Sequence, residues 1–147
     1  MRISTKVRYG TRALVELALS YPEQTVSVSE IAEKESISPK YLEHIMAPLK
    51  AAGLVVSTRG MHGGYELARP PEKITLSEVY TALEGSPAPV DCVDDPGSCP
   101  MEEVCPTFET WLEMKRSIQD ILENTTLRCL AERKRSKTRA TAPMYHI

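Results

Sequence analysis

The chain has 147 residues, with 18 Lys and Arg against 20 Asp and Glu, a net charge of −2, and 41% hydrophobic residues. This length suits one domain with an appended helix, and the composition is ordinary for a soluble protein. No apolar run approaches the ~20 residues that span a bilayer, and residues 1–9 lack the apolar core of a signal peptide. We therefore expect a cytoplasmic protein that does not associate with a membrane.

The charge is unevenly distributed along the chain. Residues 1–69 carry nine Lys and Arg against seven Asp and Glu, residues 70–130 four against twelve, and residues 131–147 five against one. The first part is mildly basic, which is compatible with nucleic-acid binding, whereas the middle part is strongly acidic.

Residues 3–19 are predicted to form a first helix that Tyr21-Pro22 ends. Basic side chains lie near its start, where they oppose the helix dipole: Arg2, Lys6, Arg8 and Arg12. A solvated charged face and an external anion are the two explanations of this run.

Residues 27–53 have the pattern of a helix–turn–helix. Ser27 and Glu30 fit a capping box before a short helix over residues 29–35, and Ser38-Pro39 suits the start of a second helix. The apolar residues of the second helix recur at helical spacing and predict one buried stripe: Leu42, Ile45, Met46 and Leu49. Gly53 is a favourable residue for the end of the second helix. Pro48 breaks the pattern, and we expect it to bend or loosen the helix after Ala47. The helix is nevertheless expected to continue, because Leu49 extends the stripe.

Residues 54–68 are typical of a β-hairpin, with strands over 54–57 and 65–68 around a Gly-rich turn. A hairpin after a helix–turn–helix is a wing, and that motif places its second helix in the DNA major groove. The polar side chains that this arrangement presents are candidates for DNA contact: Lys40, Tyr41, Glu43, His44, Arg59 and Gly60. The alternative is a helical hairpin and a β-hairpin in an unrelated small α+β domain.

A further short helix is predicted after the link Pro70-Pro71. Thr75 and Glu78 fit a second capping box, and Gly85 suits the stop. Residues 86–106 follow as a loop that is too long to be a mere connection.

This loop contains Cys92, Cys99 and Cys105. Clustered thiols in a cytosolic chain indicate metal or redox chemistry rather than a structural disulfide. Zinc ligands usually occur in pairs closer than these, and the wider spacing favours an iron–sulfur cluster. Zinc and incidental thiols remain the alternatives. Cys129 is expected to be a small buried hydrophobe.

Residues 107–131 are predicted to be helical, and their apolar face is too wide for a lone surface helix: Phe108, Trp111, Leu112, Ile118, Ile121 and Leu122. We expect this face to pack against a second copy of the chain. Within this stretch, Thr126 is expected to cap one more short turn through Leu130. Residues 132–147 have no apolar period and are predicted to be a disordered basic tail.

The predicted organisation is mainly α-helical: a winged helix–turn–helix domain over residues 1–85, a cluster-binding loop over 86–106, a dimerisation helix over 107–131 and the tail. No Ser/His/Asp set, phosphate-binding loop or carboxylate pair has usable spacing, and the histidines are scattered. The sequence therefore does not predict an enzyme.

The chain resembles the IscR/NsrR/CymR family of bacterial winged-helix regulators, within the Rrf2 superfamily, from residue 1 to about 131. The matching stretches are MRISTKVRYGTRAL, SISPKYLEHI, LVVSTRGMHGGYELAR and the three cysteines before a long helix. The resemblance implies a homodimer on double-stranded operator DNA, with Tyr41 and His44 near bases, Arg59 in the minor groove, and Glu43 at a position that tunes operator choice.

The resemblance also implies a [2Fe-2S] cluster, with [4Fe-4S] as the alternative, held by Cys92, Cys99 and Cys105. Cluster state would then control operator binding and report iron–sulfur status, oxidative stress or nitric oxide. One departure concerns the fourth ligand, because Phe108 replaces the histidine of IscR-like members. The remaining candidates are Glu109, Cys129, the partner's first helix and a small molecule. Other members lack a cluster and respond to a metabolite, a partner protein or thiol oxidation.

Overall fold

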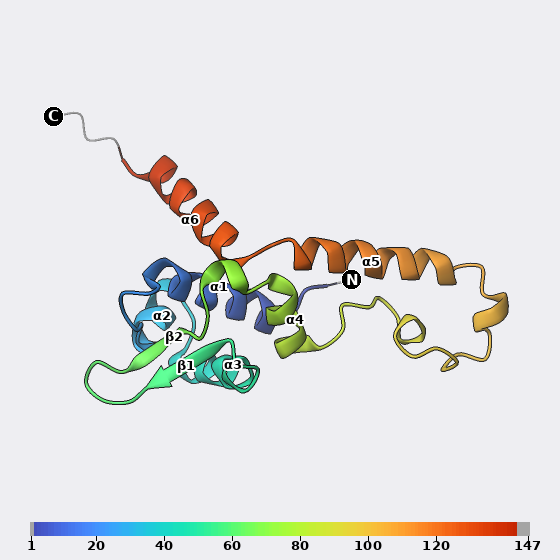
Figure 1. Ribbon diagram of the computed structural model, residues 1–147, viewed down its shortest axis with the longest axis horizontal. Coiled ribbons are helices and arrows are strands. Elements are labelled where there is room, and N and C mark those ends of the chain that lie inside the picture. Colours follow the sequence, from blue (N-terminus) through green and yellow to red (C-terminus); the bar gives the residue numbers. More distant parts are fainter. Residues whose placement is uncertain (1, 144–147) are drawn as a thin grey trace.

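The computed structural model describes residues 2–143 and has a mainly helical winged-helix architecture (Figure 1). The elements in chain order are α1 (Thr5–Ser20), α2 (Val28–Glu35), α3 (Pro39–Ala51), β1 (Val55–Thr58), β2 (Gly64–Leu67), α4 (Leu76–Glu84), α5 (Phe108–Glu123) and α6 (Leu127–Thr141). Short 3-10 turns lie at η1 (Pro71–Lys73), η2 (Asp91–Val93) and η3 (Glu102–Val104). The predicted fold class is confirmed.

Side-chain caps begin the helices of the helix–turn–helix. Ser27 accepts a hydrogen bond from the Glu30 amide, and Ser38 accepts one from the Tyr41 amide at 3.1 Å. Only half of the predicted capping box at Ser27 forms, because the Glu30 carboxylate accepts from Lys34 at 3.0 Å. At α4 both halves form, between Thr75 and Glu78.

Helix α3 continues past Pro48 to Ala51, so the predicted loosening after Ala47 is wrong. The four residues of the predicted stripe are fully buried, and their packing holds the last turn in place although Pro48 donates no hydrogen bond. Gly53 then has a φ of 73°, in the left-handed region that ends helices.

The hairpin pairs β1 and β2 antiparallel, with Val55 opposite Leu67 and Thr58 opposite Gly64. Each strand differs from its predicted bounds by about one residue. Val26 pairs with Tyr65 through two backbone hydrogen bonds of 2.8 and 2.9 Å, which join the hairpin to the α1–α2 connection. A side chain at Gly64 would meet the Val26 carbonyl, so the pairing requires glycine there.

Helix α1 lies at the centre of the core and contacts α2, α3, α4, α6 and β2 (Figure 1). Gly10 permits the closest of these approaches, since a β-carbon there would lie 2.5 Å from Leu83 Cδ1 of α4 and 3.1 Å from Ile45 Cγ2 of α3. This packing fixes the recognition helix against α1.

A short backbone pairing joins the C-terminal helices to the winged-helix body. Ile74 and Leu76 exchange backbone hydrogen bonds with Leu127 and Thr125 at 3.0 and 2.7 Å. The helical stretch predicted over residues 107–131 is interrupted at 124–126. Thr126 caps the next helix as predicted, but this helix, α6, continues to Thr141 instead of ending near Leu130. Helix α5 therefore extends away from the body, and α6 packs back onto α1 (Figure 1).

The prediction of a disordered tail is wrong for residues 133–141, which belong to α6. Helix α6 has no apolar period in this part, but Lys134 forms ion pairs with two buried carboxylates of the body. The last four residues of the predicted tail lie outside the described part of the chain. Within residues 2–143, no helix is both long and apolar enough to cross a membrane.

Candidate nucleic-acid interface and cysteine loop

The N-terminal end of α3 presents polar side chains to solvent. Its cap and first two turns line an open depression of about 580 Å³: Ser38, Lys40, Tyr41, Glu43 and His44. Lys40, Glu43 and His44 are exposed, because the residues between them turn inward as the buried stripe. All four predicted α3 contact residues therefore share one surface, as the helical period requires.

Tyr41 is the most buried of the four residues. It is half-buried, and its ring packs edge-on against Tyr9 of α1 with 6.2 Å between ring centroids. The Arg12 guanidinium lies 5.5 Å from the centroid of the Tyr9 ring. Stacking of this kind holds a side chain in one orientation, so α1 positions part of the α3 surface.

The wing presents Arg59 and Gly60, both exposed, at the turn between β1 and β2. Gly60 has a φ of 110°, which L side chains rarely adopt, and a side chain there would meet nothing within 4 Å. The turn is tied to the body at His62, whose carbonyl accepts a hydrogen bond from Thr25 at 2.9 Å. Arg59 thus projects from a hairpin that is fixed at its base.

The three loop cysteines lie beside α5 rather than in the winged-helix body (Figure 1). Lys115 of α5 holds the loop: its ammonium pairs with Asp94 at 2.5 Å and donates to the Val93 carbonyl at 3.2 Å. Hydrogen bonds from Lys115 and Ser86 lower the pKa of Asp94, so the pair is ionised at neutral pH. The first part of the loop is therefore attached to α5.

The thiols of this loop differ in their electrostatic surroundings. Burial and the charges of Cys99 and Cys105 raise the pKa of Cys92. The Thr107 hydroxyl, 3.4 Å from Cys105 Sγ, hydrogen-bonds the sulfur and lowers the pKa of Cys105. Thr107 was not singled out from the sequence, although its position two residues after a cysteine is a signal that could have identified it.

The three thiols are free and half-buried, and their charges act on one another. Among residues 2–143, however, no group of three or more His, Cys, Asp and Glu side chains is placed to hold a metal ion. Phe108, which follows at the start of α5, has no ligating atom. Cys129 is half-buried at the start of α6, in a different element from the loop, rather than fully buried as expected.

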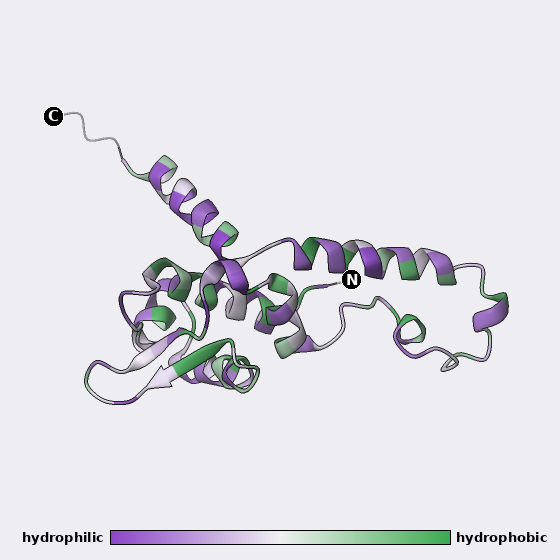
Figure 2. Cartoon of the chain, viewed as in Figure 1, coloured by the Kyte–Doolittle hydropathy of each residue, from purple (hydrophilic) through white to green (hydrophobic). Residues whose placement is uncertain are grey.

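The apolar side chains of α5 range from buried to exposed, and Phe108, Trp111 and Leu112 of the predicted face are half-buried. Of the six residues on the predicted face, Leu122 is buried and Ile118 packs against the core, whereas Ile121 is 66% exposed. Met114 of the same helix is 38% exposed. Figure 2 shows these hydrophobic stretches alternating with hydrophilic ones along α5.

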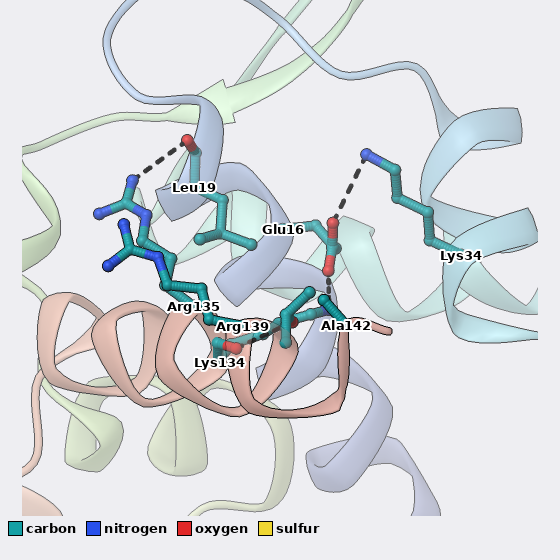
Figure 3. Close-up of a pocket in the computed structure, with 8 residues that line it drawn as sticks. Glu16, Leu19, Lys34, Lys134, Arg135, Arg139 and Ala142 are labelled. Atoms are coloured by element: carbon teal, nitrogen blue, oxygen red, sulfur yellow. Dashed lines mark hydrogen bonds and ion pairs between the residues drawn. The ribbon is translucent and has the colours of Figure 1, made fainter. Parts of the chain in front are cut away.

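A buried ion-pair network joins α6 to the helix–turn–helix, and the sequence analysis did not find it. Glu16 of α1 and Glu35 of α2 are 5% and 3% exposed, and both accept from Lys134. Glu16 also pairs with Lys34 at 3.6 Å (Figure 3). Glu35 pairs with Arg12. The available signal was a glutamate at position 16, inside the run of buried residues from 13 to 18.

Comparison with known proteins places this geometry in context. The family model described as "Rrf2: Iron-dependent Transcriptional regulator" matches residues 3–133. "Protein rrf2" of Nitratidesulfovibrio vulgaris is 42% identical over 127 residues, which are 86% of this chain and 85% of that protein.

Two solved structures share the fold over nearly their whole length. CymR, "the Global Cysteine Regulator of B. subtilis", has a TM-score of 0.76 and 37% identity, over 90% of this chain and 98% of that one. T. potens IscR has a TM-score of 0.75 and 34% identity, over 99% of this chain and 95% of that one.

Proposed function

The chain belongs to the Rrf2 family of DNA-binding transcriptional regulators, and from this premise we propose that α3 and the wing read operator DNA under the control of the cysteine loop. One observation carries the proposal. The polar N-terminal end of α3 and the exposed Arg59 are both positioned by α1 and its connection to α2, while the cysteine loop is attached to α5.

In this proposal α3 enters the major groove. Tyr41 and His44 contact base edges, which carry a distinguishable donor and acceptor pattern there, and Lys40 contacts phosphate. Glu43 restricts which operators are accepted, because a carboxylate accepts from cytosine and repels phosphate. Arg59 enters the minor groove, where a narrow groove attracts a single cation, and Gly60 lets the backbone come close.

The operator-binding form is a homodimer joined through α5. The uncovered apolar side chains of α5, Met114 and Ile121 among them, support this arrangement. A two-fold dimer presents two copies of α3 to two half-sites of one operator. Since the cysteine loop is held by Lys115 of α5, a change in the loop can act on the relative position of the two reading heads.

We propose that Cys92, Cys99 and Cys105 hold an iron–sulfur cluster. Thiolate is the ligand such clusters prefer, and the three thiols are free and lie on one loop. Within residues 2–143 they do not form a ready three-ligand group, so the loop would have to draw them together around the cluster. The bound cluster would supply sensitivity to oxidants and nitric oxide. With Phe108 at the position of the family histidine, the fourth ligand comes from outside the loop.

A second candidate function is a cluster-free regulator controlled by thiol oxidation, by a metabolite or by a partner protein. The four free thiols favour it, and Cys105 has a hydroxyl partner 3.4 Å from its sulfur. The fold is shared with both CymR and IscR, which is compatible with either candidate.

Spectroscopy of anaerobically purified protein separates the two candidates. We expect visible absorption with iron and sulfide bound, lost in each of the Cys92→Ser, Cys99→Ser and Cys105→Ser variants. Cys129→Ser is the matched control and should retain the iron. A colourless, iron-free protein, or iron lost only in the Cys129 variant, would overturn the cluster proposal, and operator binding that then changes on thiol oxidation would establish the second candidate.

A further inference from the structure

A second basic surface lies away from α3 and the wing, between α1, the end of α2 and α6. It is a groove of about 580 Å³ that Thr11, Val15, Glu35, Leu130 and Thr138 line together with five cations. The cations are Arg12, Lys34, Arg133, Lys134 and Lys137. Lys34, Lys134 and Thr138 also line the neighbouring groove drawn in Figure 3.

The positive charge of this groove exceeds the acidic groups that face it. Glu35 is the one carboxylate in its lining among the described residues, and Glu16 lies behind, paired with Lys34 and Lys134. Lys34 also pairs with Glu30 at 3.0 Å. Counting all three carboxylates, five cations face three anions, so the groove carries about two uncompensated positive charges at neutral pH. Arg133 and Lys137 have no salt-bridge partner within residues 2–143.

The cations are crowded rather than spread over a solvated helix face. Lys134 lies against both buried carboxylates, and its pKa is lowered by burial and by the charge of Arg12. Arg12 keeps a repulsive effect on Lys134 although Glu35 pairs with both of them. An anion in the groove would relieve this repulsion.

An unsatisfied hydroxyl points to the same occupant. Thr11 Oγ1 is buried and has no hydrogen-bond partner among the described residues. A buried hydroxyl without a partner is costly, and native proteins rarely keep one unless a ligand or water completes it. Because Thr11 lines the same groove, we infer that an anion which enters between the cations serves as the acceptor for this hydroxyl.

We propose that this groove is an effector site for a small multivalent anion that carries phosphate or carboxylate groups. Arg133 and Lys137 bind its charge, Thr11 donates to it, and Val15 and Leu130 form an apolar wall. Figure 1 places α6 across α1 from α3 and the hairpin, which favours a small anion over the phosphates of an operator bound at α3.

The position of the site links it to the recognition helix. Glu35 is the last residue of α2, and Ser36, in the left-handed conformation, begins the turn to α3. A bound anion competes with Glu35 for Arg12 and Lys134, which loosens the ion pairs that hold this turn against α1 and α6. The effect on operator affinity rests on the proposed function, whereas anion binding itself does not.

Calorimetric titration of the full-length protein tests the site, with pyrophosphate and citrate as probes and sodium chloride at equal ionic strength as the control. We expect one probe ion to bind per chain. Tighter binding of pyrophosphate would assign the effector to the phosphate class, and tighter binding of citrate would assign it to the carboxylate class. The Arg133→Ala/Lys137→Ala variant leaves the ion-pair network intact and should weaken binding at least tenfold. Arg139→Ala, which removes the same charge from the other groove, should change it less than twofold.

Thr11→Val provides a second test, because it should increase thermal stability while it weakens anion binding. Without added anion, the variant should have a higher midpoint of thermal unfolding, because the substitution removes an unsatisfied hydroxyl. The variant should also bind the probe anions several-fold more weakly than the natural chain does. The proposal is overturned if neither probe binds beyond chloride, or if the Arg133/Lys137 variant, folded by circular dichroism, binds them as tightly as the natural chain. It is equally overturned if that variant loses operator affinity while the probes have no effect, since the surface is then a DNA contact.

Discussion

His44 and Arg59 are both exposed and polar, but their surroundings give them different tasks. His44 lies on a rigid helix whose inner stripe is fully buried, so its position relative to a base edge is defined. Arg59 lies on a turn held by the Thr25 hydrogen bond to the His62 carbonyl, and it can follow the shape of a groove. A residue on a fixed frame reads sequence, and a long cation on a turn adds affinity.

We therefore expect the two alanine substitutions to separate specificity from affinity. His44→Ala should flatten preference at one or two positions of each half-site, at a cost of ~1–3 kcal/mol there and little on non-specific DNA. Arg59→Ala should weaken binding on all sequences and reduce the salt slope by about 0.9. Both are measured on an operator library at two salt concentrations.

The matched control lies on α5, away from the proposed surface. Arg116→Ala removes an exposed guanidinium there and should leave preference and salt slope unchanged. If the His44 and Arg59 variants both keep the sequence preference and the DNA affinity of the natural chain, α3 and the wing do not form the reading surface.

Among the elements, α4 shows most clearly how a local device supports the body. Thr75 and Glu78 satisfy each other's backbone donors, and Arg69 donates to the Glu78 carboxylate at 2.6 Å. Burial alone would raise the pKa of Glu78, but the hydrogen bonds from Thr75 and Arg69 outweigh it and lower that pKa below its ordinary value. The ionised carboxylate is therefore the form that stabilises the folded state.

The stability supplied by Glu78 should depend on pH in a defined direction. A carboxylate whose pKa is lower in the folded state stabilises above its ordinary pKa, and this stability is lost as the pH falls through the folded value. Glu78→Gln should cost about 1 kcal/mol of unfolding free energy at pH 7, and the difference should shrink below about pH 4. Urea unfolding at fixed protein concentration from pH 7 to pH 3 measures it.

Glu72→Gln is the control for this experiment. Glu72 is exposed in the neighbouring turn η1 and has no salt bridge among residues 2–143, so its loss should change stability little at any pH. If the loss of unfolding free energy in Glu78→Gln stays constant down to pH 3, the charge of Glu78 does not contribute to stability.

At the scale of the whole molecule, α5 is the element that the protomer leaves uncovered. Ile118 and Leu122 serve the protomer's own core, so replacing them would confuse folding with assembly. Met114 and Ile121 are exposed and are the better probes. A buried dimer interface excludes unpaired charge, because desolvating a carboxylate costs several kcal/mol.

We expect Met114→Glu/Ile121→Glu to shift the protein from dimer to monomer at micromolar concentration in sedimentation experiments, with its helical content unchanged. Met61→Glu introduces the same charge at an exposed methionine of the wing and should leave the dimer intact. An intact dimer with glutamate at both α5 positions would place the subunit interface elsewhere.

Most of the structural features that the sequence alone determined depend on local chemistry. The caps at Ser27, Ser38 and Thr75 and the stripe on α3 depend on neighbours within four positions. This is why the bounds of the helix–turn–helix were predicted within about a residue, and why the polar residues of α3 were expected on its outer face. Pro48 was misjudged because its local penalty is outweighed by the burial of Leu49 and the rest of the stripe.

The tertiary structure decided the features that join distant positions. Residues 133–141 have no helical period of apolar side chains, yet they are helical because Lys134 reaches Glu16, 118 positions away, and because Leu127 pairs with Ile74. The anion groove likewise gathers α1, α2 and α6 around Thr11. Such contacts leave no periodic trace in the chain, since a buried ion pair needs only one residue from each element.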